Sequence, residues 1–160
     1  MSDLPPKRTF EVIPGVGVPP VHFGMTYADV RHVLGDPDRE DSVAWFYDEC
    51  RLLVNFDEIG EVEFIEFTWS GPECDVRYNG VSVFDTLADE LVRIISGELL
   101  ATEAHTFTSD ELGFALWRPV LPPYSCPEDP DDEYRNGRYW QTIGIGTSQF
   151  IRRTQLEQSQ

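Results

Sequence analysis

Positive charge is scarce in this chain of 160 residues. Lysine and arginine together number 12 against 29 aspartates and glutamates, and the formal net charge is −17 at pH 7. Nucleic acids and anionic lipids are bound through lysine and arginine, so we expect neither a nucleic-acid partner nor a membrane partner. The excess of acid favours a basic protein partner, which long-range attraction would steer towards the chain. A surface that serves solubility alone is an equally good interpretation.

Cysteines and long apolar runs are also few. Cys50, Cys74 and Cys126 are irregularly spaced and odd in number, so they predict no disulfide framework. No stretch approaches the ~18 apolar residues of a membrane-spanning helix, and the first residues lack the apolar core of an export signal. We therefore expect a cytoplasmic protein with free thiols.

Metal-binding motifs are missing from the sequence. His22, His32 and His105 lie far apart, and no Cys-x-x-Cys or His-Glu-x-x-His spacing occurs. The acids of 129–133 alternate as in a calcium loop, but the glycine and the final bidentate acid of such a loop are absent. This segment is better interpreted as a solvated acidic loop. We expect no metal and no cofactor.

Catalytic motifs are missing as well. The sequence contains neither a Gly-x-Ser-x-Gly nucleophile motif nor a glycine-rich phosphate loop that opens a helix. Acids flank Cys126 and would blunt it as a nucleophile. Glu63 and Glu66 fall on opposite faces of an expected strand, so they would not share a proton. The chain is therefore not expected to be an enzyme.

What the sequence does contain is a repeated order of elements. An arm rich in proline and glycine (1–20) precedes a first unit (21–72). There Thr26 and Asp29 predict a helix N-terminus with a capping box, and Gly35 predicts its end. Three strand-like runs follow at 43–47, 50–56 and 62–69, separated by turn residues.

The same order returns in a second unit (73–150). The residues Thr86-Leu87-Ala88-Asp89 repeat the pattern of Thr26-Tyr27-Ala28-Asp29 60 residues later, and the helix that they open is expected to end at Gly97. Strands are expected at 105–107, 113–117 and 139–145, with a long acidic loop at 118–137 and a frayed tail at 151–160. We therefore predict an α+β fold of two tandem repeats. Each has one helix and a three-stranded antiparallel sheet, and the sheets are either separate or joined as one curved sheet.

The first helix opening also carries a resemblance. The segment Phe23-Gly24-Met25-Thr26, followed by Val30 and by Leu34-Gly35-Asp36-Pro37, resembles the helix-opening motif of outer-membrane assembly lipoproteins of the BamE/SmpA type. It also resembles that of the β-lactamase inhibitory protein (BLIP). The whole pattern is similar to uncharacterised cytosolic proteins of actinobacteria. The resemblance implies a tandem-repeat fold whose concave sheet grips a target protein.

The leading hypothesis for function is a non-catalytic protein-binding module, of an inhibitor or immunity type, that engages a basic partner through a sheet face. Aromatic side chains on the expected strands would anchor the partner, and acids of the long loop would attract it. The anchors are Trp45, Tyr47, Trp69, Trp117 and Tyr139, and the acids are Asp129, Asp131, Asp132 and Glu133. For any single ring, a place in the core is the competing interpretation.

Two other functions stay open. One is a small-molecule-binding protein, or an enzyme of unknown reaction, with a pocket between helix and sheet. The other is a homodimer that uses the aromatic face for assembly.

Overall fold

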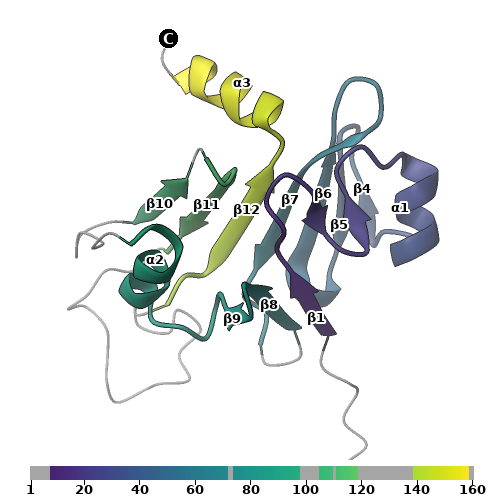
Figure 1. The fold of residues 1–160 in the computed structure, drawn as a ribbon. Coiled ribbons are helices and arrows are strands. Elements are labelled where there is room, and N and C mark those ends of the chain that lie inside the picture. Colours follow the sequence, from purple (N-terminus) through teal and green to yellow (C-terminus); the bar gives the residue numbers. More distant parts are fainter. Residues whose placement is uncertain (1–7, 72–73, 98–104, 110, 119–138, 159–160) are drawn as a thin grey trace, which may run out of the picture.

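The structure is a computed structural model that describes residues 8–71, 74–97, 105–109, 111–118 and 139–158. Its centre is a seven-stranded sheet in which every neighbouring pair is antiparallel, in the order β10-β11-β12-β7-β6-β5-β4 (Figure 1). The strands in chain order are β4 (Arg39–Glu40), β5 (Ala44–Tyr47), β6 (Leu52–Phe56), β7 (Val62–Thr68), β10 (Thr106–Ser109), β11 (Phe114–Trp117) and β12 (Thr142–Gly146).

The expected fold class is wrong. Instead of two helix-plus-sheet repeats, the described chain is mostly sheet, with one large antiparallel sheet and three α-helices. The reason lies in β7, which pairs with β6 along one edge and with β12 along the other. The alternation of apolar residues predicts that a strand exists, but it does not say which strand will occupy each of its edges.

Two smaller sheets lie beside the large one. In one, β1 (Arg8–Glu11) runs parallel to β8 (Cys74–Tyr78), which pairs with β9 (Val81–Ser82); in the other, β2 (Gly17–Val18) pairs with β3 (Val21–His22). Part of the segment expected to be an arm is therefore built into sheets. The 60-residue spacing recurs locally, because Val18 pairs with Val21 and Tyr78 pairs with Val81 in two hairpins of the same register.

Three α-helices accompany the sheets: α1 (Tyr27–Leu34), α2 (Ala88–Ser96) and α3 (Ser148–Gln158). The capping box is confirmed, since Thr26 Oγ1 accepts a hydrogen bond from the Asp29 amide at 3.3 Å and Asp29 Oδ2 accepts one from the Thr26 amide at 3.1 Å. Gly97 ends α2 in the left-handed conformation, with φ 74°, as expected. The tail expected to fray instead forms most of α3.

The core lies on one face of the large sheet. Val54 and Ile65 of the sheet are fully buried, as are Val30 of α1 and Leu91 of α2. Trp140 is 1% exposed, and its indole Nε1 donates a hydrogen bond to the Ala88 carbonyl of α2 at 3.2 Å. We call this side of the sheet the core face, and the opposite side the open face.

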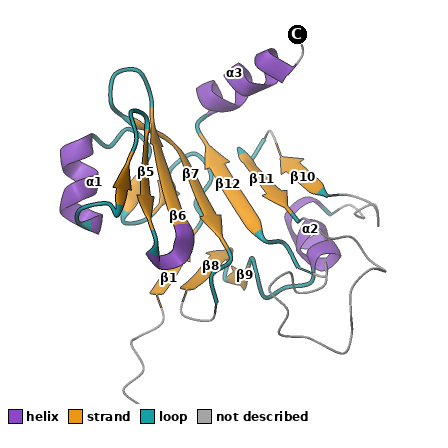
Figure 2. Cartoon of the chain, turned by 180° about the vertical axis from the view of Figure 1, so that it is seen from behind, coloured by secondary structure: helices purple, strands orange, loops and turns teal. Residues whose placement is uncertain are grey.

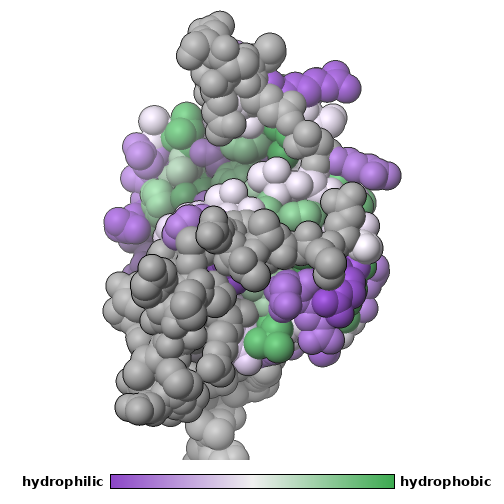
Figure 3. Space-filling model, turned by 90° about the vertical axis from the view of Figure 1, so that its left-hand side faces the viewer, coloured by the Kyte–Doolittle hydropathy of each residue, from purple (hydrophilic) through white to green (hydrophobic). Residues whose placement is uncertain are grey.

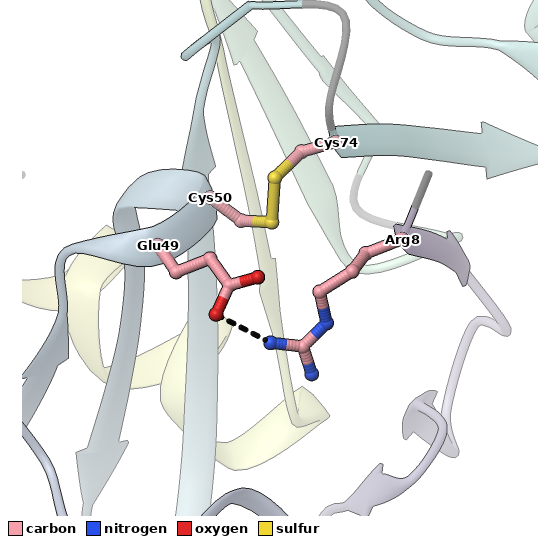
Figure 4. Close-up of a disulfide and its surroundings, with 4 residues drawn as sticks. All are labelled: Arg8, Glu49, Cys50 and Cys74. Carbon is pink, nitrogen blue, oxygen red and sulfur yellow. Dashed lines mark ion pairs between the residues drawn. A yellow bond between two sulfur atoms is a disulfide. The ribbon is translucent and has the colours of Figure 1, made fainter. Parts of the chain in front are cut away.

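The expectation of free thiols is wrong for two of the three cysteines. Cys50 and Cys74 form a disulfide, with their Cα atoms 5.5 Å apart (Figure 4). Cys50 lies in the short 3₁₀ helix η1 (Glu49–Arg51) between β5 and β6, and Cys74 begins β8. Beside the disulfide, Arg8 of β1 pairs with Glu49 at 3.1 Å. These contacts fasten the β5–β6 connection to the small sheet. Cys126 lies outside the described residues.

We expect Ile65→Ala to lower the free energy of unfolding by about 2–5 kcal/mol, because it removes buried methylenes from the middle of the sheet. Ile59→Ala is the matched control, since Ile59 is 78% exposed in the turn between β6 and β7, and a change within about 0.5 kcal/mol is expected there. Urea unfolding followed by circular dichroism measures both. Equal losses in the two variants would contradict the assignment of the core face.

We expect reduction of the Cys50–Cys74 bond to destabilise the protein by about 3 kcal/mol, because the bond spans 24 positions of the chain and restricts the unfolded state. Urea unfolding with and without a thiol reductant measures the difference. The double variant C50A/C74A should be insensitive to the reductant. Peptide mapping under non-reducing conditions should recover the two cysteines as a linked pair, and their recovery as free thiols would refute the bond.

Candidate functional site

Two of the five predicted aromatic anchors belong to the core. Trp45 is 5% exposed and packs edge-on against Phe56 with ring centroids 5.0 Å apart. Tyr47 is also buried, and its hydroxyl donates a hydrogen bond to the Gly35 carbonyl at 3.0 Å. Burial raises the pKa of Tyr47 to about 12. These two rings hold α1 onto the sheet, so they are not available to a partner.

The other predicted site residues are spread over the molecule. Trp69 is half-buried against the core, and Tyr139 is half-buried and bridges to Leu87. Trp117 is 43% exposed at the end of β11, on the open face. The four acids of 129–133 lie outside the described residues. The predicted aromatic surface is therefore reduced to Trp117.

The register of the sheet places one residue from each strand in a continuous row across the open face. Each member is the direct partner of the next, and Figure 2 shows the sheet from this side. The row runs through Thr108, Ala115, Gly144, Glu66, Leu53, Phe46 and Arg39. The carboxyl group of Glu66 lies in the middle of the row beside the apolar Leu53 and Phe46, and the guanidinium group of Arg39 lies at one end.

One end of the open face is covered by α3. The ring of Phe150 stacks on that of Phe64 with centroids 4.6 Å apart, and a Cβ at Gly144 would lie 2.6 Å from the Phe64 ring. The glycine therefore allows Phe64 to lie flat across β12. In Figure 2, α3 lies beyond the upper end of β12, and the middle of the sheet carries no helix on this side.

Glu63 also lies on this side of the sheet, which corrects its expected orientation. A β-bulge shifts the register between Asn55 and Phe56, so the alternation of side chains along β7 is interrupted. Glu63 accepts hydrogen bonds from Asn55 at 3.3 Å and from Arg153 of α3. This glutamate anchors the C-terminal helix.

The part of the open face that α3 leaves uncovered contains a hollow of about 440 Å³. It lies where β5, β6 and β7 meet the η1 turn, and polar and apolar groups share its wall. We call it the Glu66 hollow, lined by Arg39, Phe46, Tyr47, Asp48, Arg51, Leu52, Leu53, Glu66 and Thr68. Of the two lining residues that carry a hydroxyl group, Tyr47 donates its own to the Gly35 carbonyl on the core side, and Thr68 remains.

Glu66 is a half-buried carboxyl group in the wall of this hollow. Burial raises its pKa above the ordinary 4.5. Its lateral partners in the sheet are Gly144 and Leu53, and neither supplies a hydrogen-bonding side chain. Desolvation without a compensating charge disfavours the ionised form. A ligand with a donor or cationic group at this point would relieve that cost.

Arg39 and Arg51 supply the positive charge of the hollow. Arg8, Arg31, Arg77 and Arg153 each pair with a carboxylate, whereas neither Arg39 nor Arg51 forms an ion pair with a described residue. The guanidinium of Arg39 lies 4.6 Å from the centre of the Phe46 ring. The hollow therefore holds two guanidinium groups that have no carboxylate partner among the described residues.

The backbone at Arg51 is strained. Cys50 and Arg51 have φ values of 64° and 44°, in the left-handed region that side chains other than glycine rarely adopt. Such conformations persist where the surrounding structure holds them, and they are common at functional sites. Here the disulfide at Cys50 and the Arg8–Glu49 ion pair hold the turn.

Sequence reasoning missed Arg39, Arg51, Leu53 and Glu66 as site residues. The alternation of 50–56 did place Arg51, Leu53 and Asn55 together on the face opposite to the core. Nothing in the sequence brings Arg39 or Glu66 to the same place, because their proximity depends on the pairing of β4, β5, β6 and β7.

A second hollow of about 370 Å³ lies between α2, β8, β10 and the turn before β11. Its lining includes Tyr78, Ile95, Phe107 and Glu111 and contains no basic side chain. Figure 3 views the side of the molecule that bears α2 and β10, where hydrophobic and hydrophilic residues form separate small patches. The carboxylate of Glu111 is the only formal charge in this lining, and no basic group stands beside it to bind an anionic ligand.

Neither a metal centre nor a membrane-spanning helix is present among the described residues. No group of three or more histidine, cysteine, aspartate or glutamate side chains is arranged there to hold a metal ion. Within the same residues, no helix is both long enough and apolar enough to cross a bilayer.

Comparison with known proteins shows no family. No protein-family model matches the sequence, and no curated protein is similar to it. Among solved structures, the chain is similar to a DUF4309 family protein, YjgB, from Bacillus subtilis, with 12% identity and a TM-score of 0.44 over 76% of this chain and 78% of that one. A likeness this distant does not bear on function, and it does not test the resemblance to the BamE/SmpA and BLIP groups.

We expect Glu66→Gln to stabilise the protein at pH 7 more than at pH 4. The pKa of Glu66 is raised in the folded state, so the folded protein holds this proton more tightly than the unfolded chain does. Protonation of Glu66 therefore contributes its full stabilisation below the unfolded-state pKa near 4.5, and this stabilisation is lost as the pH rises through the folded-state pKa. Urea unfolding at both pH values measures the difference.

Glu58→Gln, the same substitution in the exposed turn between β6 and β7, controls for the loss of one negative charge from an acidic chain. If Glu66→Gln has the same effect as this control at both pH values, the desolvation of Glu66 is contradicted.

Proposed function

We propose that this chain is a non-catalytic protein-binding module that engages a basic partner through the open face of its large sheet. The observation that carries the proposal is the open face itself. It presents Trp117, 43% exposed, together with the half-buried Phe46 and Leu53, on a sheet that the described helices leave uncovered in its middle. A rigid sheet presents such anchors without the entropic cost of ordering a loop.

The charge of the chain supports a basic partner. A net charge of −17 attracts a cationic protein over distances of about one Debye length, roughly 10 Å at 0.1 M salt. This attraction raises the rate of encounter, while burial of Trp117, Phe46 and Leu53 would set the lifetime of the complex. The inhibitor or immunity role that we expected from the sequence is one form of this function.

A second candidate is a small-molecule-binding protein. The Glu66 hollow, about 440 Å³, falls within the range of roughly 300–1,000 Å³ that is typical of ligand pockets. It lies on the open face rather than between a helix and the sheet, where the sequence led us to look.

The disulfide changes the cellular compartment that we propose for this protein. We expected a cytoplasmic protein, but the Cys50–Cys74 bond favours an oxidising environment, because a reducing cytosol keeps most thiols free. We therefore propose that the chain works where disulfides persist.

The test is affinity capture from cells whose genome encodes the protein, with the wild type, Trp117→Ala and Ile94→Ala as baits. Ile94 is a matched control, since it is 46% exposed on α2, away from the open face. We expect a basic protein to be retained by the wild type and by Ile94→Ala, to be lost with Trp117→Ala, and to be released as salt rises from about 50 to about 500 mM.

No capture, or capture that is indifferent to Trp117→Ala, would refute the proposal. Light scattering distinguishes self-assembly: a wild-type mass of twice 18.3 kDa that returns to the monomer value in Trp117→Ala would assign the open face to a homodimer instead.

A further inference from the structure

We propose that the Glu66 hollow binds a carboxylate attached to an apolar body. The inference deepens the proposed function and rests on it, in that it names the chemistry by which the open face recognises its ligand. The carboxylate is either that of a small organic acid or the C-terminal carboxylate of a partner's peptide segment.

Charge is distributed unevenly along the row across the open face. Arg39, Phe46, Leu53 and Glu66 are direct neighbours on four successive strands. Strands lie about 4.8 Å apart, so the two ends of this row are separated by three spacings, on the order of 14 Å at the backbone. This row is therefore basic at one end, apolar in the middle and acidic at the other end, and Asp48 adds a second carboxylate to the lining of the hollow beside the η1 turn.

The two arginines of the hollow carry the charge that would bind the carboxylate. Guanidinium groups bind carboxylates through two parallel hydrogen bonds, and this geometry makes arginine the usual residue at carboxylate sites. Both Arg39 and Arg51 line the hollow, and neither is paired with a described carboxylate. Arg39 is held by its contact with the Phe46 ring, which limits the freedom of its side chain before a ligand arrives.

Arg51 is held in place by its backbone. It belongs to η1, where the left-handed backbone of Cys50 and Arg51 is held by the disulfide to Cys74. The turn therefore presents Arg51 from a braced backbone at the rim, beside Leu52 and Leu53. A preorganised group loses less entropy on binding than a mobile one.

Glu66 forms the acidic end of the row. Glu66 lies among Leu53, Thr68 and Gly144, and burial favours its protonated form. A ligand carboxylate would be repelled by an ionised Glu66, and three strand spacings keep that charge away from Arg39. The apolar body of the ligand would lie on Phe46 and Leu53, and a donor group on the ligand would meet Glu66.

The experiment measures binding of two matched probes by calorimetry. N-acetyl-phenylalanine carries a carboxylate on an apolar body, and its carboxamide has the same shape without the charge. We expect the acid to bind the wild type at least about tenfold more tightly than the amide, which is the scale of one charge-assisted hydrogen bond.

The variants R39A and R51A should each weaken binding of the acid by about tenfold or more, and should leave binding of the amide unchanged. R93A is the matched control, since Arg93 is exposed on α2 outside the hollow. The lysine variants R39K and R51K, which keep the charge but lose the planar fork, should retain part of the affinity. Circular dichroism verifies that each variant is folded.

A peptide that ends in a free phenylalanine, and its C-terminal amide, distinguish the two sources of the carboxylate. Tighter binding of the free-acid peptide than of N-acetyl-phenylalanine assigns the hollow to a partner's C-terminus, and the reverse order assigns it to a small organic acid.

Equal binding of acid and amide, no binding of either at about 10 mM, or an effect of R93A as large as that of R39A would overturn the inference. These outcomes are separable from the capture experiment. If capture depends on Trp117 but neither R39A nor R51A weakens the binding of any probe, the carboxylate site alone is refuted. If the probes bind as expected but no protein is captured, the protein-binding function alone is refuted.

Discussion

The pairing of β7 with β12 is the contact on which the rest of the structure depends. It joins Phe64–Thr68 to Thr142–Gly146, and it converts two strand meanders into one seven-stranded sheet. Both strands then have neighbours on each edge, so their backbone groups are satisfied within the sheet. The same pairing brings Gly144 beside Glu66 and lets the ring of Phe64 lie over β12, where Phe150 of α3 stacks on it.

A single broad sheet explains why the molecule has two unlike faces. The core face is covered by α1, α2 and the N-terminal strands, which bury Val30, Leu91 and Phe10 against it. In the described chain, the open face is covered only at its α3 end. The aromatic residues divide according to this geometry: Trp45 and Tyr47 point to the core face, whereas Trp117 points to the open face. Side-chain type alone did not distinguish them, because buried and exposed rings look the same in a sequence.

The local elements were largely predictable and their assembly was not. The caps of α1 at Thr26 and Asp29, the glycine that ends α2 and the strands from β5 to β7 follow from short-range rules that act within a few residues. The fold class, the Cys50–Cys74 disulfide and α3 were missed. Each depends on contacts between distant segments, such as those of η1 with β8 and of Phe150 with Phe64. The bulge in β7 also reversed the expected side of Glu63, since a single extra residue interrupts the alternation.

The sequence by itself determined the charge of the molecule, the positions of most strands of the large sheet and the two helices that follow Thr26 and Thr86, because these features depend on composition and on periodicity along the chain. Only the tertiary structure decided which strands are neighbours, which face is open and which residues meet in the Glu66 hollow. The physical reason is that a strand's hydrogen-bonding edges carry no information about their partner. Arg39 and Glu66 become parts of one site only after four strands have paired in register.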